Sequence, residues 1–179
     1  MKEQKYDIYR YYGKYKENIE EIIKRPNRLK YIILYRRINN TKNKILKNIY
    51  KYKLLRLSKK THIQIPVSTR IGRGFYIGHD GPVIINPSVI IGNNVNVHAG
   101  VVIGQENRGT RKGTPIIGSE VWISSNAVIV GNINIGNDVL IAPLSYVNFD
   151  VPDHSIVIGN PGKIIKKDNA TDGYINRKV

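Results

Sequence analysis

Residues 116–147 read IIGSEVWISSNAVIVGNINIGNDVLIAPLSYV, and an aliphatic residue recurs at every sixth position of this stretch. A single β-strand would alternate with a period of two, whereas a period of six indicates short strands separated by corners. Stacked as a solenoid, such units bury one continuous aliphatic column. The stretch therefore predicts a parallel β-helix. Its aliphatic residues recur at Ile117, Ile123, Ile129, Ile135, Ile141 and Val147.

The same period extends towards the N-terminus, and glycine often follows the aliphatic residue, where a tight corner tolerates unusual dihedral angles. The repeat predicts a mainly β domain at residues 63–152 with a long loop at 104–116. Eight extra residues precede Ile117, and two extra residues follow Val83. The earlier aliphatic positions are Ile65, Ile71, Ile77, Val83, Ile91, Val97 and Ile103.

The first 62 residues have a different character. They hold 19 Lys and Arg against five Asp and Glu, a net charge of +14, whereas the whole chain carries +16. Nine of the twelve tyrosines also lie before Thr61. Residues 1–62 are therefore expected to form a basic segment of their own, and residues 153–179 a C-terminal extension whose polar end, 168–179, is poorly ordered.

Helical spacing of apolar residues predicts three short helices in the basic segment, at 15–25, 28–38 and 42–58. Their apolar faces are expected to pack on the β-helix or on each other, because none is large enough to stand alone. The three apolar stripes consist of Ile19, Ile22 and Ile23, of Leu29, Ile32 and Ile33, and of Ile45, Ile49 and Tyr52.

Composition excludes several classes of protein. The chain has no cysteine, so it has no disulfide framework and no cysteine nucleophile. No apolar run approaches the roughly 20 residues of a membrane span, and we expect a cytoplasmic protein. The basic excess has two interpretations: a solvated lysine-rich face, or attraction to an anionic surface such as the inner face of the membrane. No nucleic-acid motif is present, so nucleic acid is not an expected partner.

Two of the four histidines are candidates for chemistry. Three hexads make one coil, so His79 and His98 should lie on the same side in adjacent coils, within a few ångströms to roughly 8 Å. His62 and His154 lie at the ends of the repeat and are expected to be structural or exposed to solvent. The long loop after Ile103 is expected to lie beside the histidine pair. It carries Gln105, Glu106, Arg108, Arg111 and Lys112.

Residues 71–81, IGRGFYIGHDG, resemble the first catalytic stretch of serine O-acetyltransferases. Residues 101–104, the loop and residues 115–123 resemble the same family, as do 150–152 and 159–165. The similarity covers about residues 54–166 and is specific to hexapeptide-repeat acyltransferases, closest to the short serine-acetyltransferase-like enzymes of bacterial capsule and exopolysaccharide pathways. It implies a left-handed β-helix, acetyl-CoA as the donor, no metal, and a homotrimer with active sites between subunits.

By this resemblance, His79 matches the general base, with direct transfer in a ternary complex. Three other positions depart from the family, because its supporting aspartate, its second histidine and the acid before the base fall at Gln64, Thr114 and Gly78. We expect His98 to supply part of the missing catalytic machinery. Asp80, Arg108 and Arg111 are the candidate acceptor-binding residues. The positions matching CoA-binding residues are Ser125, Pro143, Lys163 and Lys166.

The departures put serine in doubt as the acceptor. The first functional hypothesis is therefore O-acetylation of a sugar hydroxyl in surface polysaccharide synthesis, and the alternative is serine O-acetylation for cysteine synthesis. A further alternative is a non-catalytic β-helix that binds a partner through its basic segment. A carbonic anhydrase of this fold needs three converging imidazoles on Zn²⁺, and only two converge here.

Overall fold

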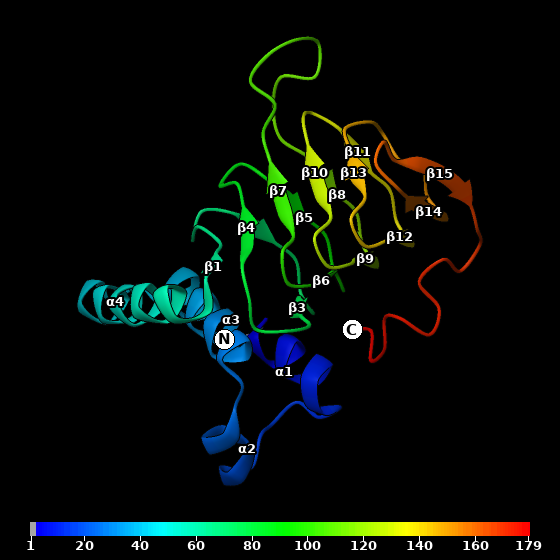
Figure 1. The fold of residues 1–179 in the computed structure, drawn as a ribbon. Coiled ribbons are helices and arrows are strands. Elements are labelled where there is room, and N and C mark those ends of the chain that lie inside the picture. Colours follow the sequence, from blue (N-terminus) through cyan, green and yellow to red (C-terminus); the bar gives the residue numbers. More distant parts are fainter. Residues whose placement is uncertain (1–2) are drawn as a thin grey trace.

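Three parallel sheets form the sides of a prism, and the chain visits them in turn (Figure 1). The computed structural model describes residues 3–179. The first sheet contains β1 (Ile63–Gln64), β4 (Val83–Ile85), β7 (Val102–Gly104), β10 (Val128–Val130) and β13 (Tyr146–Val147). The second contains β2 (Arg70–Ile71), β5 (Ile90–Ile91), β8 (Ile116–Ile117) and β11 (Asn134–Ile135). The third contains β3 (Tyr76–Ile77), β6 (Asn96–Val97), β9 (Val121–Ile123), β12 (Val139–Ile141), β14 (Ser155–Ile158) and β15 (Lys163–Lys166).

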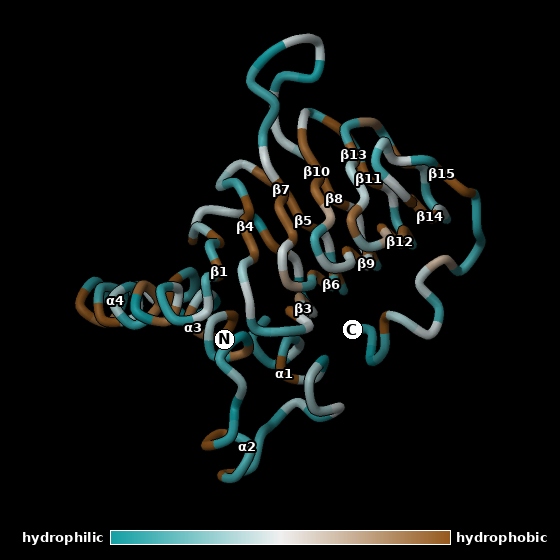
Figure 2. The backbone as a smooth tube through the Cα atoms, viewed as in Figure 1, coloured by the Kyte–Doolittle hydropathy of each residue, from teal (hydrophilic) through white to brown (hydrophobic). Residues whose placement is uncertain are grey.

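The inside of the prism is the aliphatic column that the repeat predicts. Of the thirteen aliphatic positions named above, only Ile71 is not buried, and it lies partly exposed in the first coil. Apolar strands alternate with polar corners along the prism (Figure 2). The mainly β, parallel solenoid is therefore confirmed.

The two extra residues lie earlier than expected. Ile85, rather than Val83, pairs with Ile103 in the first sheet, while Val83 pairs with Ile63. The insertion therefore widens the corner between β3 and β4, which carries His79. The misplacement arose because Val83 and Ile85 both point inward and both fit an aliphatic position.

The β-helix also continues beyond residue 152. The parallel strand β14 pairs with β12, with Val139 opposite Ser155 and Ile141 opposite Val157. The antiparallel strand β15 then covers the exposed edge of β14. The Asp150-Val151-Pro152 corner thus does not end the solenoid, because the next strand still supplies an inward residue, Val157.

Four helices precede the prism: α1 (Gln4–Tyr12), α2 (Ile19–Lys24), α3 (Asn27–Asn40) and α4 (Lys44–Thr61). The last two lie where helices were predicted, whereas the first predicted helix is reduced to α2. α1 was not predicted, because its sequence QKYDIYRYY has no aliphatic stripe. It is held by tertiary contacts instead: the Asp7 carboxylate accepts hydrogen bonds from Arg36 and from the Phe75 backbone N–H.

Only one of the three predicted apolar stripes is buried. Leu29, Ile32 and Ile33 of α3 are at most 2% exposed. The stripes of α2 and α4 face outward, so the prediction that they pack on the β-helix or on each other is wrong. α4 turns Leu54 inward instead, whereas α2 buries none of its residues. No helix among residues 3–179 is long and apolar enough to cross a membrane.

Candidate functional site

The two candidate histidines lie at one corner of the prism. His79 follows β3 and His98 follows β6, and these strands pair with Ile77 opposite Val97. The ring centroids are 5.8 Å apart, as the coil spacing predicts. The His79 side chain is exposed, whereas that of His98 is partly buried. A substrate can therefore reach His79 directly.

His98 is held in an apolar position. Its ring lies 4.4 Å from the Trp122 ring, and its Nε2 is buried without a hydrogen-bond partner. Burial, together with the neighbouring His79, lowers the pKa of His98 to about 4. At neutral pH the imidazole is thus uncharged, with one ring nitrogen able to donate and the other to accept.

Gly78 makes room for His98. A Cβ atom at position 78 would lie 2.4 Å from Cε1 and 2.5 Å from Nδ1 of His98. Any side chain at position 78 would therefore clash with the His98 ring unless the ring moved. The acidic residue that the resemblance to serine O-acetyltransferases implies at this position is therefore incompatible with His98 in its present position, so Gly78 and His98 are physically linked.

Asp80 connects the histidine corner to the helices. Its Oδ1 accepts a hydrogen bond from the backbone N–H of Arg28 at 3.1 Å and lies 3.6 Å from Nη1 of the same residue. Arg28 belongs to the first turn of α3, so the helical segment borders the site.

The structure places two of the candidate donor-binding residues on the same edge as the histidines. Ser125 follows β9 and Pro143 follows β12, so both lie at the corner from the third sheet to the first, as His79 and His98 do. We call this row, His79, His98, Ser125 and Pro143, the histidine edge. Lys163 and Lys166 lie on β15, at the far end of the third sheet, and both are exposed.

The long loop leaves a different corner. It connects β7 of the first sheet to β8 of the second and projects away from the prism (Figure 1). Its base is pinned by two hydrogen bonds between Glu106 and Gly113. Within one chain, Arg108 and Arg111 therefore do not lie beside the histidines as expected. The reason is geometric: one hexad after His98 the chain has turned one side further around the prism.

A polar cavity of about 520 Å³, which no sequence pattern predicts as a whole, lies on the outer face of the third sheet. Three of the lining residues, Tyr76, Asn96 and Trp122, each precede an inward aliphatic residue. The hexad register could therefore have placed these three on the outer face of the third sheet. The rest comes from α1 and the C-terminal tail, which no local pattern could bring together. The complete lining is Arg10, Tyr11, Tyr76, Asn96, Trp122, Tyr174, Asn176 and Arg177.

This cavity carries positive charge. Arg10 is 5% exposed and donates to the Gly74 carbonyl oxygen and to Oδ1 of Asn96, but no carboxylate lies within 4 Å of it among residues 3–179. Its Nε is buried without a partner. Burial lowers the pKa of Arg10 to about 10, which still leaves it charged at neutral pH. The cavity therefore suits an acceptor with an anionic or hydrogen-bonding group and a face for an aromatic ring.

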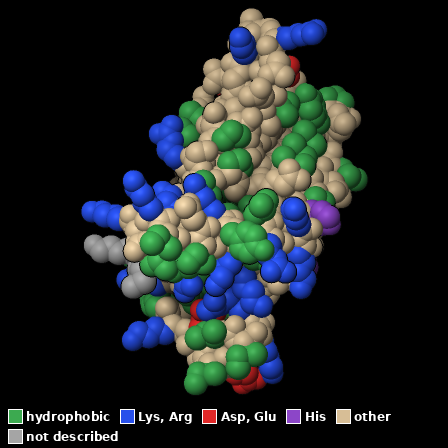
Figure 3. All heavy atoms as spheres, turned by 90° about the vertical axis from the view of Figure 1, so that its left-hand side faces the viewer, with side chains coloured by type: hydrophobic (Ala, Val, Ile, Leu, Met, Phe, Trp, Pro, Cys, Tyr) green, Lys and Arg blue, Asp and Glu red, His purple; other side chains and the backbone are tan. Residues whose placement is uncertain are grey.

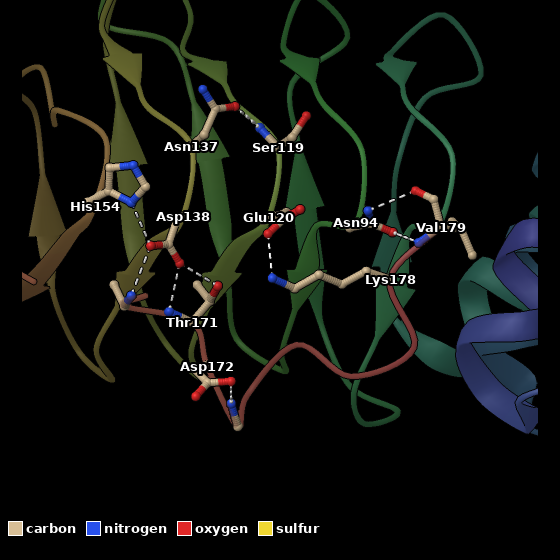
Figure 4. A network of polar contacts seen from close by, with 12 residues as sticks. Asn94, Ser119, Glu120, Asn137, Asp138, His154, Thr171, Asp172, Lys178 and Val179 are labelled. Carbon is tan, nitrogen blue, oxygen red and sulfur yellow. Dashed lines mark hydrogen bonds and ion pairs between the residues drawn. The ribbon is translucent and has the colours of Figure 1, made fainter. Parts of the chain in front are cut away.

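The tail that covers this cavity is bound by one residue in each of three coils, Asp138, Glu120 and Asn94 (Figure 4). Asp138 accepts hydrogen bonds from His154 and from the backbone N–H groups of Ala170 and Thr171. Glu120 pairs with Lys178, and the Asn94 side chain bonds the Val179 backbone. The expectation of a poorly ordered end at 168–179 is therefore wrong, because its polar residues match a row of polar corners.

His154 has the structural role that the sequence indicated. Its Nδ1 lies 2.8 Å from Oδ2 of Asp138, and this hydrogen bond raises the pKa of His154. Burial acts to raise the pKa of Asp138. The hydrogen bonds from His154, Thr171 and Ala170 outweigh burial and lower this pKa to about 2. Residues 3–179 contain no group of three or more His, Cys, Asp or Glu side chains that could hold a metal ion.

No family model matches the chain. A serine acetyltransferase of Staphylococcus aureus is 37% identical over 113 residues, which cover 63% of this chain and 53% of that protein. The solved serine acetyltransferase of Neisseria gonorrhoeae in complex with serine superposes with a TM-score of 0.74 at 26% identity, over 92% of this chain and 68% of that one. A serine acetyltransferase in complex with CoA superposes with a TM-score of 0.64 at 26% identity, over 78% and 57%.

The chain is similar to serine acetyltransferases. The resemblance in the motifs is thereby confirmed, in sequence and in fold. The chain spans about half the length of the Staphylococcus aureus relative that it matches. Its similarity to the solved structures includes the helical segment, since 92% of the chain superposes.

Proposed function

We propose that this chain is an acetyl-CoA-dependent O-acetyltransferase. The observation that carries the proposal is the histidine edge, where an exposed imidazole stands at the head of a row that continues along the prism past Ser125 and Pro143. CoA is a long ligand, and such a row gives it a straight path to His79. The complexes of related proteins with CoA and with serine support both halves of the reaction.

In this mechanism His79 takes the proton from the acceptor hydroxyl as its oxygen attacks the thioester carbonyl carbon. The carbon–sulfur bond then breaks, and the proton passes to the departing CoA sulfur. Proton transfer by a placed imidazole contributes roughly 10²–10⁴-fold to the rate. Uncharged His98, 5.8 Å from His79, adds no positive charge that would weaken the base.

Serine is the acceptor that the relatives favour, since the related proteins described above are named for it. Thiol release from acetyl-CoA, measured with L-serine and with a panel of neutral and acidic sugars, tests this directly. We expect serine to support turnover. No release with any acceptor would contradict the proposal and favour a non-catalytic binding protein.

A sugar hydroxyl is the second candidate, and the Arg10 cavity favours it. Aromatic rings from Tyr76, Trp122 and Tyr174 beside a guanidinium without a carboxylate partner suit an acidic sugar ring. If a sugar is the acceptor, Tyr174→Ala should raise its KM about tenfold and leave the KM for acetyl-CoA unchanged. Asp172→Ala, an exposed change in the same tail, is the matched control.

We also propose that the chain acts as a homotrimer packed through the first sheet. Its outward residues form an apolar ladder in register, in which Ile84 is 41% exposed and Val102, Val128 and Tyr146 are partly buried. This sheet lies between the loop corner and the histidine edge. A neighbour packed on it would bring its own Arg108 and Arg111 towards the histidines of the first chain. Light scattering tests the assembly, and an active monomer would contradict it.

A further inference from the structure

A basic groove lies between α3 and α4, and none of its lining residues belongs to the histidine edge. Its volume is about 490 Å³. It contains six cationic side chains around an apolar floor, and no acidic residue lines it. The cations are Arg25, Lys30, Arg37, Lys53, Arg56 and Lys60, and the floor consists of Ile33, Leu34 and Leu57.

The groove arises because two helices present matching rows. On α3, Lys30, Leu34 and Arg37 are spaced by four and three residues, which places them on one helix face. On α4, Lys53, Leu57 and Lys60 repeat this spacing. Where the two helices pack together, apolar side chains meet at the bottom and cations stand on both rims.

The charge of this groove is almost entirely uncompensated. Arg25 pairs with Glu17 at 2.6 Å. The other five cations have no carboxylate within 4 Å among residues 3–179. α4 as a whole carries seven Lys and Arg and no acidic residue. Cations gathered at this density repel one another, and an anion bound between them relieves the repulsion.

An exposed apolar stripe lies next to the groove on the same helix. Ile45, Ile49 and Tyr52 are 73%, 43% and 62% exposed, and their spacing places them on one face. At 100° per residue, Lys44 and Lys51 fall on one side of this face and Lys53 and Lys60 on the other. Figure 3 shows hydrophobic side chains at the surface of the helical segment with Lys and Arg around them.

We propose that the α3–α4 groove and the α4 stripe form a binding site for the phosphate groups of an anionic lipid surface. Phosphate oxygens would lie between the two cationic rims, and the stripe would enter the boundary between headgroups and acyl chains. A basic helix with an exposed apolar face is the pattern of helices that lie in a membrane interface. A free phosphate explains the groove but leaves the stripe without a partner.

Charge also argues against a second copy of this chain on the same surface. Two such segments would each bring a net charge of +14 into contact. The proposal does not depend on the acetyltransferase chemistry, because no groove or stripe residue belongs to the histidine edge.

The test is sedimentation of the full-length protein with vesicles of neutral phosphatidylcholine, with and without phosphatidic acid, at low and high salt. We expect binding only to the anionic vesicles and release as salt rises. Inorganic phosphate at millimolar concentration should compete weakly. Equal binding to neutral vesicles, no binding at low salt, or full displacement by millimolar phosphate would overturn the proposal.

Two double variants separate the groove from the stripe. Lys53→Gln with Lys60→Gln removes two groove cations, and Ile45→Ser with Ile49→Ser removes apolar surface at constant charge. Each should weaken vesicle binding at least about tenfold and leave turnover with acetyl-CoA unchanged. Deleting residues 1–40 is unsuitable, because it would remove the buried Leu29 and Ile38 of α3.

Matched controls make the same changes elsewhere. Arg70→Gln with Lys112→Gln removes two exposed charges from the β-helix domain. Ile19→Ser with Ile23→Ser removes two exposed isoleucines from α2, which carries Glu20 and Glu21. Vesicle binding should stay within about twofold for both. The assignment to α3 and α4 is overturned if a control weakens binding as much as the groove or stripe variant, or if the stripe variant breaks up an oligomer without weakening binding.

Discussion

The β-helix and the helical segment bury the same kinds of residue to very different extents. Ile129 in the first sheet is 0% exposed, whereas Ile45 in α4 is 73% exposed, although both belong to regular apolar patterns. In the solenoid each coil is covered by the next, so a repeat brings its own partner. A helix does not carry its own covering neighbour. An apolar helix face that does not meet the core therefore needs a partner from another segment or another molecule. An amphipathic pattern thus predicts an apolar face but not what covers it.

The joint between the two regions should be the most sensitive point. Arg36 of α3 pairs with Asp7 of α1 at 2.8 Å and also donates to backbone carbonyl oxygens of Ile71 and Gly72. Both side chains are buried. We expect Arg36→Met to lower the free energy of unfolding by about 3–5 kcal/mol, because it leaves the Asp7 charge buried without a cationic partner. Denaturant unfolding measures this, and a loss below about 1 kcal/mol would show that the helices are attached mainly by apolar contacts.

The next effect compares one isoleucine from each region. Ile129→Ala should cost about 3 kcal/mol, because it opens a cavity in the aliphatic column. Ile45→Ala should change stability by less than about 0.5 kcal/mol, because its side chain already faces outward. The same unfolding experiment compares the two. Similar losses would mean that α4 is covered in solution.

A smaller effect concerns the tail. Asp138→Asn should cost about 2 kcal/mol, because the carboxylate accepts hydrogen bonds from His154, Ala170 and Thr171. The folded pKa of about 2 lies below the ordinary 3.8, so this contribution is present above about pH 4 and is lost as the pH falls towards 2. His154 changes the stability of the tail with the opposite pH dependence, because its pKa is raised in the folded state. Its contribution to stability is lost as the pH rises through that pKa.

Proteolysis of the tail as a function of pH measures this effect. The tail of the wild-type protein should become sensitive below about pH 4, and that of the Asp138→Asn variant should be sensitive at neutral pH. Asp172→Asn is the control, because Asp172 is exposed and, among residues 3–179, its carboxylate accepts a hydrogen bond only from the backbone N–H of the adjacent Gly173. If the tail of the Asp138→Asn variant stayed resistant to proteolysis at neutral pH, the contacts of Glu120 and Asn94 would be sufficient to order it.

Much of the fold could be predicted from the sequence because the hexad period reports directly on burial. The period placed the aliphatic column and brought His79 next to His98 in space. It could not locate the insertion before Ile85, since Val83 also points inward. The end of the solenoid was predicted too early, because Pro152 signals a corner but says nothing of the strand after it.

The remainder of the site depends on contacts between distant segments. Arg10 and Tyr174 meet Trp122 only after α1 and the tail have folded onto the third sheet. No local pattern contains that information. The link between Gly78 and His98 is likewise visible only in space, although Gly78 stands out in the sequence as a departure from the family and His98 as a candidate for chemistry.

The proposed function depends above all on His79 as the base of an acetyl transfer. The direct test is acetyl-CoA turnover, with the best acceptor of the panel, for the wild-type protein and for single alanine variants of His79, His98 and His62. We predict a loss of at least about 100-fold for His79→Ala with fold and assembly unchanged, a smaller loss for His98→Ala, and no loss for His62→Ala, which lies at the end of α4. An active His79→Ala variant beside an inactive His98→Ala variant would contradict the account.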